Sequence, residues 1–165
     1  MKTKGAAHTA MKSAEKMAQK ELKTEKQKIE KLQKLRKIFW FEKFNWFITS
    51  ENYIVLSGRN AQENEILVKK YLKKGDIFVH ASVHGAATTI IKNPSGQPVS
   101  PISLNEAGMY CICRSSAWEQ KLITGAFWVY HHQVSKTAPS GEYLQTGSFM
   151  IRGKKNYLHP SKLEV

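Results

Sequence analysis

The chain has 165 residues, 41% of them hydrophobic, which is enough for one compact domain with an appendage but not for two independent enzymes. Its 26 Lys and Arg residues against 13 Asp and Glu residues give a formal charge of +13, which predicts a polyanionic partner such as nucleic acid. No apolar run approaches the roughly 18 residues of a membrane span, and no apolar signal-peptide core opens the chain, so we expect a cytoplasmic protein with no membrane partner.

Residues 1–38 form the first predicted segment, a basic helix. They hold twelve Lys and Arg residues against four Glu, and they contain no Pro. Strong helix formers dominate from Thr9 onward. Apolar residues recur at intervals of three, four and once seven, at Met11, Ala14, Ala18, Leu22, Ile29 and Leu32. This spacing predicts the last part of a longer coiled coil, whose basic face is either an ordinary solvated surface or a surface that grips RNA.

Residues 39–165 form the second predicted segment, an α+β domain. Its mainly antiparallel sheet is covered by two helices. The first helix is expected over 60–74, capped by Asn60 and stopped at Gly75. The second is expected from about Leu104 to Ile123, with Ser103 as cap and Glu106 completing a capping box. Strands are expected over 45–50, 53–59, 76–83, 87–93, 125–135 and 148–153.

Two patterns raise the question of a metal site or a disulfide. Asp76, His80 and His84 have a spacing that would suit ligands on a helix, but on a strand the two His residues lie roughly 13 Å apart. Cys111 and Cys113 are too close in sequence for normal bridge geometry, and they have no other Cys to complete a zinc site. We therefore expect no metal, no cofactor and no disulfide.

The segment from Phe127 to Leu158 mixes aromatic rings, turn residues and cations. His131 and His132 are adjacent on a predicted strand, so one is expected to face solvent, where it could stack on a base or contact a phosphate. Lys136 and Thr137 begin a loop whose hydroxyls and amides suit phosphate oxygens, although the pattern of a nucleotide-hydrolysing loop is missing. The patch that we predict to bind phosphate is completed by Arg152, Lys154 and Lys155.

Two further groups have both structural and binding interpretations. Arg59, Asn64 and Glu65 open the first helix of the domain, where a helix cap with a local ion pair explains them about as well as a ligand contact. The aromatic residues at the start of the domain recur too closely for one face to bury all of them, so some are expected at a partner surface: Trp40, Phe41, Phe44, Trp46 and Phe47.

Several long peptides occur in the order found in one known family. They are WFEKFNWFITSENYIVLSGRNAQENE, KKGDIFVHASVHGA, IKNPSG and FWVYHHQVSKTAPSGEYLQTGSFMIRGKKNYL. Over roughly residues 39–160 the chain resembles the RNA-binding (NFACT-R) domain of the NFACT ribosome quality control proteins. The resemblance implies a noncatalytic module that binds rRNA, tRNA or both on the large ribosomal subunit. For the parent protein it implies engagement of subunits that carry peptidyl-tRNA, support of carboxy-terminal tailing and cooperation with an E3 ubiquitin ligase.

Two alternatives stay open at the level of sequence. One is a nuclease or nucleotide-modifying enzyme that uses His80, His84, His131 or Lys136, although no acidic partner is evident. The other is a protein-interaction module that docks through its coiled coil and its aromatic cluster.

Overall fold

The computed structural model describes residues 3–83, 85–121 and 123–160, with side chains of the first helix described from Met11 to Lys31. The chain divides into two compact units, Met1–Trp40 and Phe41–Val165. Within the described residues, no helix is long and apolar enough to cross a membrane.

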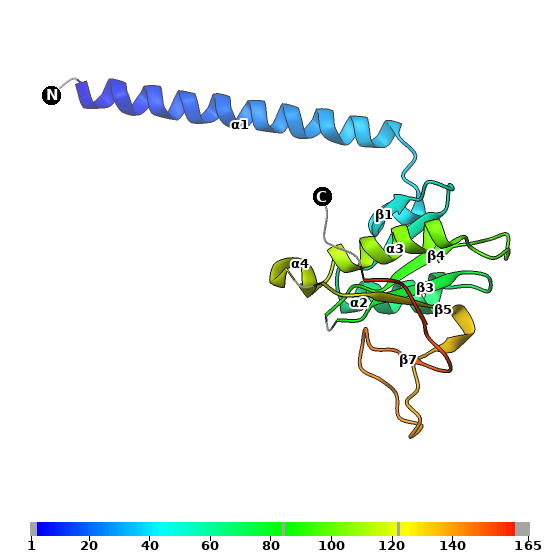
Figure 1. Ribbon diagram of the computed structural model, residues 1–165. Helices are drawn as coiled ribbons and strands as arrows, with labels where there is room; N and C mark the ends of the chain where they lie inside the picture. Colours follow the sequence, from blue (N-terminus) through cyan, green and yellow to red (C-terminus); the bar gives the residue numbers. More distant parts are fainter. Residues whose placement is uncertain (1–2, 84, 122, 161–165) are drawn as a thin grey trace. The chain divides into compact units, whose positions relative to one another are not determined.

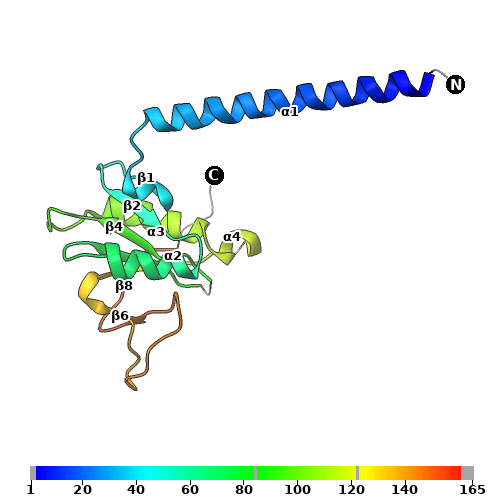
Figure 2. The ribbon, with the colours of Figure 1, turned by 180° about the vertical axis from the view of Figure 1, so that it is seen from behind.

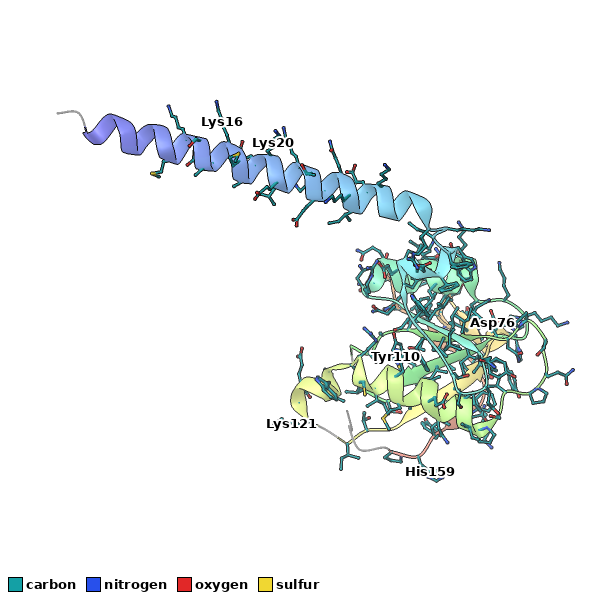
Figure 3. All side chains as sticks on the ribbon, turned by 90° about the horizontal axis from the view of Figure 1, so that it is seen from above. Lys16, Lys20, Asp76, Tyr110, Lys121 and His159 are labelled. Carbon is teal, nitrogen blue, oxygen red and sulfur yellow. The ribbon has the colours of Figure 1, made fainter. Side chains whose placement is uncertain are left out.

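The first unit consists mainly of helix α1, Thr3–Leu35. Its 33 residues confirm the predicted helix, and Lys16 and Lys20 project outward from it (Figure 3). Met11, Leu22 and Ile29 of the apolar seam are 65%, 57% and 53% exposed. The coiled coil itself stays a prediction.

The second unit contains a six-stranded sheet in the order β1-β2-β4-β3-β5-β8. Every pair of neighbours is antiparallel, which confirms the predicted α+β fold with a mainly antiparallel sheet. The strands are β1 Asn45–Ile48, β2 Ile54–Ser57, β3 Ile77–Ala81, β4 Thr89–Lys92, β5 Ala126–Tyr130 and β8 Asn156–Tyr157. A short 3₁₀ helix, η1 (Trp40–Lys43), precedes β1.

Alternation along the strands produces two cores, one on each face of the sheet. On one face, Val55, Ile77 and Ile91 form a buried cluster with residues of helix α3, Pro101–Cys113. On the other face, the buried cluster of Leu56, Phe78 and Ile90 includes Leu67, which opens the π-helical turn η2. Figures 1 and 2 show α3 and α2 on opposite sides of the sheet.

The first helix of the domain begins as predicted and ends earlier. Helix α2, Ala61–Ile66, is capped by Asn60, whose side chain accepts the backbone N–H of Glu63. It continues into η2, Leu67–Tyr71, rather than reaching Gly75. The predicted end is wrong because Asp76 Oδ2 accepts the backbone N–H of Lys73 at 2.9 Å, which fixes a turn before β3. Figure 3 labels this aspartate.

The second predicted helix is wrong in its cap and in its length. Ser100 caps α3, and Pro101 follows as its first residue. Ser103 is buried instead, where its hydroxyl donates to Glu51 Oε2 at 2.5 Å. Glu106 accepts the backbone N–H of Ser50 rather than completing a capping box. A separate short helix, α4 (Ser116–Gln120), has its own cap at Ser115, so helix does not extend to Ile123.

The carboxy-terminal segment leaves the sheet and returns to it. β5 stops at Tyr130 because the side-chain oxygen of Gln133 accepts the Tyr130 N–H, and His131–Gln133 form the 3₁₀ turn η3. The predicted strand through the His pair is therefore wrong. A two-stranded sheet follows, in which β6 (Val134–Ser135) pairs with β7 (Met150–Ile151), so only two residues of the predicted strand over 148–153 are extended. The chain then rejoins β5 through β8.

Candidate nucleic-acid interface

A cavity of about 1220 Å³ opens on the face of the sheet that α2 partly covers. Its floor belongs to β3, β5 and β8, and its walls come from the start of α2, the loop after β3 and the segment from Thr146 to Ile151. This volume exceeds the roughly 300–1,000 Å³ of ordinary small-molecule pockets.

The floor of the cavity is aromatic because three antiparallel strands place rings opposite one another. His80 pairs with Phe127 across β3 and β5, and Phe127 pairs with Tyr157 across β5 and β8. The ring centroids lie 6.0 Å apart in the first pair and 6.1 Å apart in the second. Phe127 is 7% exposed and Tyr157 is 71% exposed, so the floor offers one accessible ring beside a buried one.

The charged side chains that line the cavity are cationic. They are Arg59, Arg114 and Lys155, and no Asp or Glu is among the described residues that line the cavity. Lys155 Nζ lies 4.4 Å from the centre of the Phe127 ring, a cation–π geometry. Low-dielectric walls around several cations concentrate a positive potential inside the cavity. An anionic ligand is therefore favoured.

Arg59 lies just before the N-cap of α2 and is held by Glu63 of that helix and by the Lys43 carbonyl. Its guanidinium pairs with Glu63 at 2.6 Å and donates to the Lys43 carbonyl at 2.7 Å, while more than half of the side chain stays exposed. The hydrogen bond from Arg59 lowers the pKa of the Glu63 carboxyl. The partner of Arg59 is thus Glu63 and not Glu65, which the sequence pattern groups with it, and this ion pair orients a cation at the cavity wall.

One wall is locked to α2 by a nearly buried ion pair. Lys136 Nζ donates to Glu65 Oε2 at 2.7 Å and to the carbonyls of Gln145 and Ser148. The same carboxylate oxygen accepts the Gly147 N–H at 2.9 Å. Burial alone would raise the pKa of Glu65, but the hydrogen bonds from Lys136, Gly147 and Lys69 lower it to about 2. Lys136 thus acts within the wall rather than at an open surface.

Gly147 allows this wall to approach α2 closely. Its φ is +80°, in the left-handed region, and a Cβ there would lie 2.8 Å from Ala61 Cα. Any side chain would separate the segment from the helix.

His80 is the polar member of the floor. Its Nδ1 lies 2.8 Å from the Ala81 carbonyl, and burial lowers its pKa, so the ring is neutral near pH 7. A neutral imidazole in a cavity lined by cations can contact a base without adding repulsion.

A second cationic corner adjoins the return strand. Gln133 Nε2 donates to the carbonyls of Arg152 and Lys154, both at 2.9 Å, and the Arg152 N–H donates to the Gln133 carbonyl. Both cationic side chains are exposed. Exposed His132 stacks against Tyr130 with the ring centroids 5.7 Å apart, and His131 is half-buried. Gln133 therefore connects the His pair to the basic turn.

The predicted site residues divide into three groups. Arg59 and Lys155 line the cavity. The exposed corner is built from His131, His132, Arg152 and Lys154. Lys136 and Thr137 lie elsewhere: Lys136 is in the wall, and half-buried Thr137 is bridged to Tyr143. Sequence reasoning favoured the rings of the segment from Phe127 to Leu158 as a group but singled out neither Phe127 nor Tyr157, and it missed Arg114 as a cation. The signal available for Tyr157 was its position two residues after Lys155.

Asp76 and His80, the two described residues of the metal-like spacing, lie near opposite ends of β3. Asp76 is buried and accepts hydrogen bonds from Lys92 and from the Asn93 N–H. It precedes β3, whereas His80 lies near the other end of that strand. His84 lies outside the described residues. Across residues 3–83, 85–121 and 123–160, no three His, Cys, Asp or Glu residues come together as metal ligands.

The aromatic residues in and just before the first strand have different roles. Phe44 is buried, and Phe47 contacts Tyr110 of α3 with ring centroids 4.6 Å apart. Trp46 is 42% exposed and packs edge-on against Phe41. The cluster is thus partly core and partly surface.

A model of the family described as the NFACT protein RNA binding domain matches residues 43–153. The chain belongs to this family. The resemblance seen in the sequence is confirmed.

Relatives of the NFACT domain match almost the whole chain. The chain is 60% identical over 162 residues to the human "Ribosome quality control complex subunit NEMF". It is 46% identical over 164 residues to the Schizosaccharomyces pombe "Ribosome quality control complex subunit 2". Each alignment covers 98% of the chain, but the chain spans only 15% and 16% of these relatives.

A solved structure supports the fold of this NFACT domain. The C-terminal part of the fibronectin/fibrinogen-binding protein from Streptococcus suis aligns with a TM-score of 0.58 and 22% identity. The alignment covers 76% of the chain and 49% of that structure. At this identity the likeness concerns the fold alone.

Proposed function

We propose that the chain is a noncatalytic RNA- and ribosome-binding module of a ribosome quality control factor. The observation that carries the proposal is the cavity, because cations and aromatic rings line it without a carboxylate among its described residues. Phosphate contacts from cations position RNA, and aromatic rings accept unstacked bases. The membership of the NFACT RNA-binding family supports the same function.

The proposed partners are rRNA, tRNA or both, on the large ribosomal subunit in the cytoplasm. For the parent protein we propose that it engages obstructed large subunits carrying peptidyl-tRNA and supports carboxy-terminal tailing and nascent-chain degradation, with help to an E3 ubiquitin ligase. The names of relatives as ribosome quality control subunits support the general role, and the individual steps are what the family resemblance implies. This fragment would supply RNA contacts to them.

Salt titration of RNA binding tests the proposal. The logarithm of affinity for a structured RNA should fall linearly with the logarithm of salt concentration, because each Lys or Arg that neutralises a phosphate releases a counterion. The slope gives the number of such contacts. Absence of RNA binding at low salt, or affinity that does not change with salt, would contradict the proposal.

A second candidate function is protein docking through α1. The exposed seam residues Met11, Leu22 and Ile29 favour it, since an apolar stripe on a helix suits a partner helix. Nuclease treatment separates the two functions. Co-purification of a protein partner that survives nuclease and disappears when the three seam residues become Ser would favour docking.

A further inference from the structure

We propose that the cavity holds one unstacked nucleotide from a single-stranded stretch of RNA. This inference rests on the proposed RNA-binding function and adds the conformation of the bound RNA. It concerns the site floored by Phe127 and Tyr157, which is separate from the exposed corner at Gln133.

The floor favours an unstacked base over a duplex. In an RNA duplex the bases are paired and stacked, so a duplex would present phosphates to the cavity mouth and leave the rings without a partner. Tyr157 offers a mostly exposed ring on β8, next to buried Phe127. A base stacked on Tyr157 would cover apolar area that is now exposed to water.

The cations favour a nucleotide over an uncharged planar ligand. Lys155 and Tyr157 are two residues apart on an extended segment and both line the cavity, so a charge and a ring are offered side by side. Arg59 faces the same space from the start of α2 and is oriented by Glu63. A nucleotide matches this arrangement because it joins a planar base to an anionic phosphate.

The wall favours a preformed site. The Lys136–Glu65 ion pair and the Gly147 N–H fix the segment beside α2 before any ligand arrives. A cavity held open by such contacts loses little conformational entropy when it binds, which raises affinity for a single nucleotide.

Two hairpin RNAs test the inference with the full 165-residue chain. One is blunt, and the other carries a four-nucleotide single-stranded extension containing 2-aminopurine. The chain should bind the extended hairpin roughly tenfold more tightly, because one base–aromatic stack changes affinity by about this factor. The fluorescence of 2-aminopurine should fall on binding as its base stacks.

Tyr157→Ala should remove the preference and restore the fluorescence, whereas binding of the blunt hairpin should change less than twofold. Tyr143→Ala is the matched control, because Tyr143 is also well exposed, at 64%, but does not line the cavity. Lys155→Gln is a second variant, which should weaken the extended hairpin more than the blunt one.

The outcomes separate this inference from the proposed function. Tight, salt-sensitive binding of both hairpins with equal affinity, unaffected by Tyr157→Ala, would overturn the nucleotide site and leave RNA binding intact. Failure of both hairpins to bind at low salt would overturn both proposals. Displacement of the labelled extension by an acidic peptide, but not by adenosine monophosphate, would overturn the nucleotide site in favour of a peptide site.

Discussion

The segment of residues 131–155, which connects β5 to β8, has lysines near both ends, and these lysines have opposite roles. Near its beginning, Lys136 is 10% exposed and its ammonium contacts a carboxylate and two carbonyls of the same domain. At its end, Lys154 is exposed and Lys155 lines the cavity over an aromatic ring. The comparison teaches that a basic residue beside turn residues does not by itself indicate a phosphate contact. The acceptor that the fold brings to it decides its role.

The largest effect is expected from breaking the wall. Lys136→Met leaves Glu65 as a nearly buried charge without its main partner, and this should lower the free energy of unfolding by about 3 kcal/mol. Urea denaturation followed by circular dichroism measures the change. Lys154→Met is the control and should stay within about 0.5 kcal/mol. Equal losses of unfolding free energy in both variants would mean that Lys136 contributes no more to stability than Lys154.

Acid should weaken the same wall by a slightly smaller amount. Because the pKa of Glu65 is lowered to about 2 in the folded domain, its contribution is present above its unfolded pKa near 4.5 and is lost as pH falls toward 2. The free energy of unfolding measured across this pH window should fall by about 2 kcal/mol more in the unmutated chain than in the Glu65→Gln variant. Parallel pH profiles would contradict the assignment.

Reversal of Lys154 and Lys155 to Glu should affect binding instead of stability. We expect roughly tenfold weaker binding of structured RNA than after reversal of Lys26 and Lys28, which changes the net charge by the same amount. Filter binding at matched salt measures the difference, with circular dichroism to verify the fold. Equal losses would mean that binding follows total charge, and a larger loss at Lys26 and Lys28 would move the RNA site to α1.

The smallest effect is expected from removing residues 1–38. We propose this boundary because the two core clusters of the sheet are formed by residues from Phe41 onward. The shortened chain should melt cooperatively within about 0.5 kcal/mol of the full chain. Differential scanning calorimetry tests this, and a broad transition without a cooperative peak would show that the helix completes the core.

The sequence predicted those parts of the fold that depend on neighbouring residues. Asn60 caps α2 as its residue type and position indicate, and the strands expected over 53–59 and 76–83 contain β2 and β3. It could not predict that Glu51, about fifty residues upstream, would bind the Ser103 hydroxyl and leave the cap to Ser100. Hydrogen bonds between distant segments have no signature in local pattern.

The candidate site likewise combines residues that local sequence can identify with contacts that only the folded chain brings together. Arg59 and Lys155 were identified by their chemistry, and both line the cavity. Phe127 and Tyr157 were not identified as a ring pair, because their alignment depends on the register of β5 with β8. The fate of Lys136 depended on Glu65, 71 residues away, which only the folded chain brings within 2.7 Å.

Residues 131–155 leave the sheet after β5 and return through β8, which pairs with β5 itself. Both ends of this segment are therefore fixed to the same strand. Its middle part, orange in Figure 1, extends away from the sheet. Its exposed tip at Pro139–Gly141 can gain or lose residues without shifting any pairing in the six-stranded sheet, since loop closure depends only weakly on length. The length of this tip can thus change independently of the cavity wall, which hydrogen bonds from Lys136 and Gly147 to Glu65 hold against α2.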